Sequence, residues 1–168
     1  DGGVTAILRY TLRLLTTQQR DRITKMVIAA ELIRQKTGNK YGTTPISIGF
    51  WVGGGVTPNS FDDLKEDPED PGKARRNCNL LYKQLLTCPF CGKTLSSDNF
   101  YIDFERKTVE VYCSDSNCMF YKYKQNRMPI PVYQVDEEIY SRCPSIILST
   151  VDKFARLPWD VKTNALFG

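Results

Sequence analysis

The spacing of apolar and polar residues predicts alternating strands and helices in the outer parts of the chain. Residues 4–10 form a short apolar run after two glycines, which is typical of a buried strand. Residues 16–38 carry apolar side chains at helical spacing and end at a glycine, which predicts an amphipathic helix. Residues 45–52 and 145–150 predict two further strands, and a helix is expected to begin directly at residue 151.

The middle of the chain has a different pattern. Residues 61–71 are acidic and interrupted by prolines, which predicts a solvated loop, and a helix is expected over residues 73–86. Two β-prone runs, 100–104 and 108–112, flank a short polar turn and predict a hairpin. The acidic run from Val135 to Glu138 is interpreted as a solvated turn.

These elements predict an α/β fold with a parallel sheet. Three apolar strands with helical connections favour parallel pairing, because parallel strands need long crossovers. The expected core has two parts, residues 1–55 and 144–168. Residues 56–143 are expected to form an insertion that holds the acidic loop and, at about 87–127, a cysteine-rich module.

The composition excludes several classes of protein. The 168 residues are 41% apolar and carry a net charge of +4, which argues against a disordered tail or a fibre. No apolar run approaches the ~18 residues that a bilayer requires. The sequence has no histidine, which excludes Ser-His and Cys-His nucleophiles and histidine metal ligands.

Basic residues gather near the start of the chain. The first forty residues hold eight Lys and Arg against three Asp and Glu. This balance suits a polyanion, and a solvated helix face is the alternative interpretation. The chain opens at Asp1 with neither a methionine nor a signal peptide, so we expect an interior piece of a longer, cytoplasmic protein.

Four of the six cysteines form two close pairs. Cys88 and Cys91 make a C-x2-C followed by a glycine, and Cys113 and Cys118 make a C-x4-C beyond the expected hairpin. A hairpin that joins two such loops brings four thiolates to one point, as tetrahedral zinc requires. We therefore expect an inserted four-cysteine zinc ribbon whose zinc is structural.

Other interpretations of the cysteines stay open at this point. The run from Cys88 to Cys91 is also similar to a glutaredoxin active site, which would make the protein a thiol oxidoreductase. A disulfide pairing would require an oxidising compartment. Cys78 and Cys143 are expected to be buried small apolar residues rather than ligands.

Two segments resemble motifs of superfamily 2 helicases. Residues 4–19 resemble a strand leading into the Pro-Thr-Arg-x-Leu-x-x-Gln-like motif that grips the nucleic-acid backbone in that family. Residues 146–154 resemble a later motif of the same lobe, a strand that ends in a threonine at a helix start. The forms that these two motifs take in this sequence are most similar to those in helicases of the DISARM anti-phage system. In that group a cysteine-rich insertion also interrupts the first RecA-like lobe.

The resemblance implies a partial RecA-like sheet and a set of nucleic-acid contacts. Arg13 and Gln18 match the arginine and glutamine of the first motif, and Thr11 lies one position before the place of its threonine. Thr150 matches the threonine of the later motif, and Lys153 follows it closely. These five residues are the candidate nucleic-acid contacts, and no catalytic residue is assigned.

The implied parent protein is an ATP-dependent DNA helicase or translocase. The sequence holds no Gly-x-x-x-x-Gly-Lys-Ser/Thr loop and no acidic magnesium motif at the expected place, so ATP and Mg²⁺ are expected in the parent only. The piece alone is therefore expected to be inactive. The expected partners are nucleic acid, with DNA favoured over RNA, and other proteins of the defence system. No association with a membrane is expected. The alternative is a zinc-ribbon module that docks a partner protein without motor activity.

Overall fold

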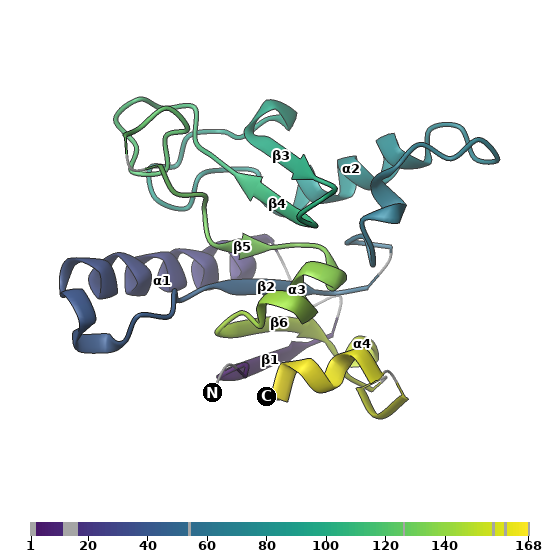
Figure 1. The fold of residues 1–168 in the computed structure, drawn as a ribbon, viewed down its shortest axis with the longest axis horizontal. Coiled ribbons are helices and arrows are strands. Elements are labelled where there is room, and N and C mark those ends of the chain that lie inside the picture. The colour runs from purple at the N-terminus through teal and green to yellow at the C-terminus, as the bar shows by residue number, and fades with distance from the viewer. Residues whose placement is uncertain are drawn as a thin grey trace.

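The chain folds into a parallel sheet with helices, joined to a small antiparallel hairpin (Figure 1). The computed structural model describes residues 3–11, 17–53, 55–125, 127–155, 157–159 and 161–167. The strands are β1 (Ala6–Tyr10), β2 (Ile48–Trp51), β3 (Phe100–Asp103), β4 (Thr108–Val111), β5 (Val132–Tyr133) and β6 (Ile146–Thr150). The α-helices are α1 (Thr17–Lys36), α2 (Lys73–Gln84), α3 (Asp136–Arg142) and α4 (Val151–Ala155). Short 3₁₀ helices are η1 (Gly38–Tyr41), η2 (Asp62–Leu64), η3 (Ser97–Asn99), η4 (Leu157–Trp159) and η5 (Val161–Phe167).

The main sheet has the strand order β1-β6-β2-β5, and each neighbouring pair is parallel. Leu148 of β6 pairs with Leu8 of β1 on one side and with Phe50 of β2 on the other. The predicted parallel α/β sheet is confirmed, and β5 adds a fourth strand that the sequence analysis did not count. Because the strands are parallel, their carboxyl ends share one edge, at the right in Figure 1.

Side chains alternate between the two faces of the sheet and build a separate apolar cluster on each. Ile48 and Phe50 pack with Val27 and Ile28 of α1 on one face. On the other face Trp51 packs with residues of α3 and of η5. Consecutive apolar residues in β2 and β6 therefore place apolar side chains on both faces, which explains why helical segments cover both.

Glycine at position 49 allows α3 to lie close to the sheet. A methyl group added there would lie 2.8 Å from Cγ of Pro144 and 3.1 Å from Cγ1 of Ile139. Both distances are shorter than ordinary van der Waals contacts. A larger residue in β2 would therefore push α3 and the loop after it away from the sheet.

The hairpin formed by β3 and β4 lies beyond the β5 edge of the main sheet (Figure 1). Its apolar residues belong to the same buried cluster as those of α1 and β2. The N–H of Ile130 donates to the carbonyl oxygen of Val111 at 2.8 Å, which ties the segment before β5 to β4. The hairpin and the main sheet thus share one apolar core.

The sequence interpretation of Val135–Glu138 as a solvated turn is wrong. This segment begins α3, and Asp136 and Glu138 are only 2% and 1% exposed. Glu138 accepts hydrogen bonds from the N–H of Val109 at 3.3 Å and pairs with Arg142, and Glu137 forms an ion pair with Lys107. These acidic side chains are held by partners from the hairpin, from α3 itself and from α4, where Lys153 pairs with Asp136.

No helix among the described residues is both long and apolar enough to cross a membrane.

Candidate metal centre and sheet edge

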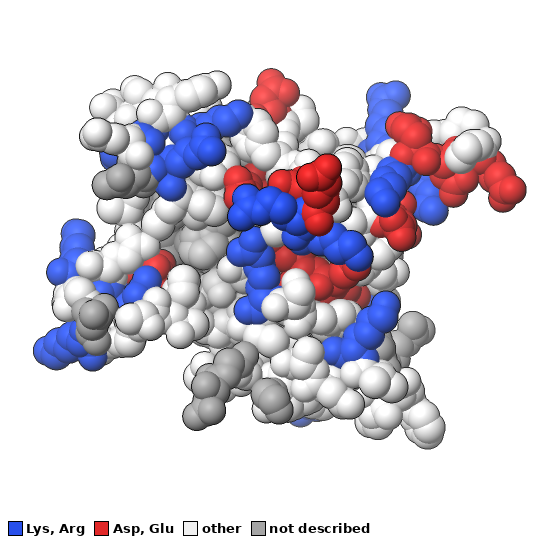
Figure 2. All heavy atoms as spheres, viewed as in Figure 1, with Lys and Arg blue, Asp and Glu red and all other residues white. Residues whose placement is uncertain are grey.

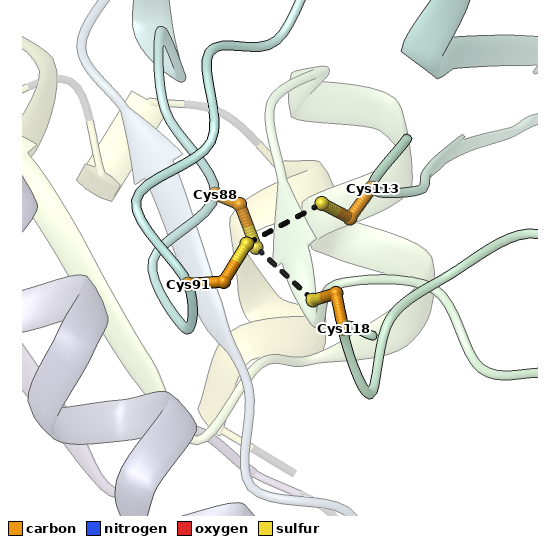
Figure 3. A group of neighbouring side chains, drawn as sticks. All are labelled: Cys88, Cys91, Cys113 and Cys118. Carbon is orange, nitrogen blue, oxygen red and sulfur yellow. Dashed lines mark hydrogen bonds between the residues drawn. The ribbon is translucent and has the colours of Figure 1, made fainter. Parts of the chain in front are cut away.

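Four cysteine side chains from two separate loops point toward one another (Figure 3). Their sulfur atoms all lie within 4.8 Å of one another. Sγ of Cys88 lies 3.7 Å from Sγ of Cys118, and Sγ of Cys91 lies 3.5 Å from Sγ of Cys113. A tetrahedral site with metal–sulfur bonds of about 2.3 Å places its sulfurs about 3.8 Å apart. The cluster therefore has the size of a four-thiolate metal site.

Backbone hydrogen bonds set the first cysteine loop. The N–H of Cys88 donates to the carbonyl oxygen of Lys93, and the N–H of Gly92 donates to that of Cys88, both at 2.8 Å. Gly92 has a φ of 78°, a conformation that residues with a Cβ rarely adopt. This tight turn aims the thiols of Cys88 and Cys91 at the second pair.

The second cysteine loop is closed in a similar way. The N–H of Cys113 donates to the carbonyl oxygen of Phe120 at 2.8 Å, and that of Cys118 donates to Asp115 at 3.0 Å. The N–H of Asp115 also lies 3.4 Å from the sulfur of Cys113, where it stabilises a thiolate. Cys88, Cys113 and Cys118 are buried, whereas Cys91 is exposed.

Burial makes two of the thiols hard to ionise. It raises the pKa of Cys88 to about 11 and also raises the pKa of Cys118. Burial disfavours the Cys91 thiolate too, but hydrogen bonds from the backbone N–H of Lys93 and from neighbouring thiols lower the pKa of Cys91. A cation that binds all four sulfurs must displace the thiol protons, so its affinity depends on pH.

The surroundings of Cys88 differ from those of a reactive redox thiol. Helix α2 ends at Gln84, ahead of Cys88, so no helix begins at this thiol to lower its pKa. All six cysteines are free, and Cys78 and Cys143 lie outside the cluster and are half-buried. The arrangement is suited to holding a metal with four thiolates, which leave no open coordination position.

A second group of candidate residues lies at the carboxyl edge of the main sheet. Nζ of Lys153 forms an ion pair with the buried carboxylate of Asp136 and donates to Oδ1 of Asn59 at 3.1 Å. The same ammonium lies 5.9 Å from the centre of the Trp51 ring. These four residues line a cleft of about 540 Å³ whose other wall includes the exposed Trp159 of η4.

The other predicted nucleic-acid contacts lie in different settings. Thr150 is only 3% exposed, and its hydroxyl donates to the carbonyl oxygen of Val52 at 3.4 Å, which links the ends of β6 and β2. Thr11 follows β1 and is exposed, and Gln18 is exposed in the first turn of α1. Arg13 lies outside the described residues. The structure thus brings Thr11, Thr150 and Lys153 to the same edge.

Sequence reasoning missed the partners of Lys153. The acidic run around Asp136 predicts a solvated turn, and Asn59 belongs to no recognisable motif. The available signal was the pair Val135 and Ile139, two fully buried apolar residues four positions apart on either side of the acidic run. Such spacing is typical of a helix that buries one face.

These features define a mixed α/β domain with a four-stranded parallel sheet and a cluster of four cysteines that can hold a metal ion. No family model matches the chain. Over its full length the chain is 49% identical, in an alignment of 174 positions, to the DISARM protein DrmA of Bacillus paralicheniformis (strain ATCC 9945a / NCIMB 11709 / CD-2). The resemblance to DISARM proteins is therefore confirmed, and the chain spans 15% of the length of that relative.

Proposed function

We propose that this chain is part of the first RecA-like motor lobe of a superfamily 2 DNA helicase or translocase in DISARM phage defence. Its similarity to DrmA and the two helicase-like motifs support this assignment. Residues 1–55 and 144–168 are proposed to belong to the lobe core, and residues 56–143 to its insertion. Other segments of the parent protein bind ATP and Mg²⁺, and this chain supplies nucleic-acid contacts and a structural zinc site.

The register of the sheet is the observation that carries the proposal. Leu8 and Phe50 both pair with Leu148, so β1, β2 and β6 end at the same edge (Figure 1). Open parallel sheets bind their ligands in the loops at this edge. Here the loops carry small hydroxyls, glycines and basic side chains, the groups that contact phosphate oxygens.

The candidate residues take different roles in this proposal. Thr11, Arg13 and Gln18 contact the sugar-phosphate backbone directly, in agreement with their exposure or their match to the first motif. Lys153 keeps its ion pair with the buried Asp136 and donates a further ammonium N–H to a phosphate. Thr150 is buried and positions the loop that follows β6.

In the proposed protein the four clustered cysteines hold Zn²⁺. Because four thiolates complete the tetrahedron, this zinc fixes the two cysteine loops and takes no part in catalysis. Its location next to the shared apolar core lets it stabilise the hairpin against the sheet.

Salt titration of DNA binding tests the proposal. The purified chain should bind a labelled oligonucleotide with an affinity that falls steeply as salt rises, since phosphate contacts release counterions. Arg13→Ala should weaken binding and reduce the slope of log K against log salt by about 1. Lys36→Ala, which removes an exposed charge from the last turn of α1, is the matched control and should change the slope less.

The alternative function, a zinc-ribbon module that docks a protein, predicts neither result. DNA binding that is absent, or that is insensitive to salt and to Arg13→Ala, would contradict the motor-lobe proposal. We also expect no ATP hydrolysis by the chain alone, since its sequence lacks the phosphate-binding loop. Release of phosphate by the purified chain would overturn that expectation.

A further inference from the structure

Four tyrosines gather on one side of the cysteine-rich module, away from the carboxyl edge of the main sheet. Tyr101 on β3 and Tyr112 after β4 pack edge to face, with ring centres 5.8 Å apart. Tyr121 and Tyr123, in the loop after Cys118, form a second such pair with ring centres 5.6 Å apart. Only Tyr123 is largely exposed, at 76%. The patch is therefore a supported aromatic surface with one ring open to solvent.

A lysine lies between the two tyrosine pairs. Nζ of Lys122 is 3.4 Å from the centre of the Tyr101 ring and 5.6 Å from that of Tyr123. Lys124 and Arg127 follow in the same loop, and residues 116–135 contain no acidic side chain. Figure 2 shows basic side chains gathered over this part of the molecule, at the upper left. The loop therefore offers positive charge beside aromatic rings, in a Tyr-Lys-Tyr-Lys alternation.

The patch borders a hollow of about 280 Å³ that is lined by polar groups and by the tyrosine rings themselves. Thr94, Ser96 and Ser114 contribute exposed hydroxyls to it, and Asp98 contributes a carboxylate. Tyr112 donates its hydroxyl to Glu110 at 3.0 Å. Two acidic groups beside the rings disfavour a dense row of phosphates, whereas hydroxyls and rings suit the edges and faces of unpaired bases.

Backbone hydrogen bonds of the cysteine loop support the two tyrosine pairs. The N–H of Tyr121 donates to the carbonyl oxygen of Cys118 at 3.2 Å. Tyr121 also forms an isolated parallel β-bridge with Cys113. The N–H of Tyr112 donates to Asn99 at 2.9 Å. Tyr123 lies in a turn that the N–H of Lys124 closes on the carbonyl oxygen of Tyr121 at 3.2 Å, and its ring packs on that of Tyr121. A ring supported in this way loses less entropy when a base stacks on it.

We propose that this face, Tyr101, Tyr112 and residues 121–124, binds single-stranded nucleic acid by stacking an unpaired base on Tyr123 and pairing its phosphates with Lys122 and Lys124. This inference rests on the proposed function, from which it takes nucleic acid as the ligand. It adds a contact site that is separate from the sheet edge and does not involve Thr11, Arg13, Gln18, Thr150 or Lys153.

The test uses the purified chain and a single-stranded oligonucleotide that carries 2-aminopurine, whose fluorescence falls on stacking. Tyr123→Ala should weaken single-strand binding on the order of 10-fold and abolish the fluorescence change, while Tyr123→Phe should preserve both. Tyr41→Ala is the matched control, because Tyr41 is also exposed and also lies beside a lysine, at 5.4 Å, but on η1. It should leave binding unchanged.

The outcomes separate this inference from the proposed function. If Arg13→Ala weakens binding but Tyr123→Ala does not, the stacking face is refuted and the sheet-edge proposal stands. If Tyr123→Ala weakens binding and Arg13→Ala does not, the stacking face stands and the edge contacts are refuted. If Tyr123→Ala weakens binding to a duplex of the same sequence equally, the proposed stacking of an unpaired base is refuted. It is also refuted if this face binds only a protein partner. Unchanged zinc content and thermal unfolding of Tyr123→Ala establish that the exposed substitution preserves the fold.

Discussion

Replacing Cys113 with serine should remove most of the metal affinity of the cysteine cluster. Its thiol is 1% exposed, and its sulfur lies 3.5 Å from that of Cys91. Structural zinc bound by four ligands contributes about 10–16 kcal/mol in small zinc peptides, or about 3 kcal/mol for each ligand. Because about 1.4 kcal/mol is a tenfold change, Cys113→Ser should weaken zinc binding on the order of 100-fold.

Competition with a coloured zinc chelator, together with metal content by mass spectrometry, measures this change. We expect one zinc per wild-type chain, and rapid loss of zinc to the chelator in Cys113→Ser. Cys78→Ser is the matched control, since Cys78 is a half-buried thiol outside the cluster. Equal zinc retention by Cys113→Ser and the wild type would refute the four-thiolate site. So would zinc loss from Cys78→Ser alone.

Three further predictions concern stability, each measured by urea unfolding. Burial raises the pKa of Glu138 to about 8, so the folded chain keeps a proton that the unfolded chain releases. The free energy of unfolding should therefore fall between about pH 4.5 and 8, by at most ~1.4 kcal/mol per pH unit. Glu138→Gln should remove this part of the pH dependence. Gly49→Ala should lower the free energy of unfolding by ~1–3 kcal/mol because it displaces α3, whereas Gly55→Ala, which has open space around it, should lower it less. Equal losses would contradict the close approach of α3 to Gly49. Arg34→Met should lower the free energy of unfolding by ~3 kcal/mol, because it leaves the buried carboxylate of Glu31 without its cation. A loss below ~1 kcal/mol would mean that the remaining hydrogen bonds are enough to stabilise this carboxylate.

Much of the sheet could be predicted because its signals are local. The apolar runs that became β1, β2 and β6 carry their own pattern, and the helix expected over 16–38 is observed as α1 from Thr17 to Lys36. Strand order was not predicted, since it depends on contacts between distant segments such as Leu8 and Leu148. The grouping of the four cysteines followed from spacing alone, because short loops restrict where their thiols can point.

Features that depend on distant partners could not be predicted. Asp136 and Glu138 resemble solvated acids in sequence, yet they are buried against Lys153 and the backbone of Val109. Strand β5 has two residues and needs β2 beside it to exist. The tyrosine-lysine alternation of residues 121–124 was visible in the sequence, but its meaning depends on Tyr101 and Tyr112 from other segments.

The common apolar core of hairpin and sheet limits how this protein can be dissected or rebuilt. Phe120 beside the cysteines and Phe50 of β2 belong to one cluster, and Glu137 and Glu138 of α3 bind the hairpin as well. An engineer who excised residues 56–143 as a cassette would remove β5 from the edge of β2 and α3 from one of its faces. A graft of the cysteine-rich module into another scaffold would in turn need a replacement for the surface that α1 and β2 now provide.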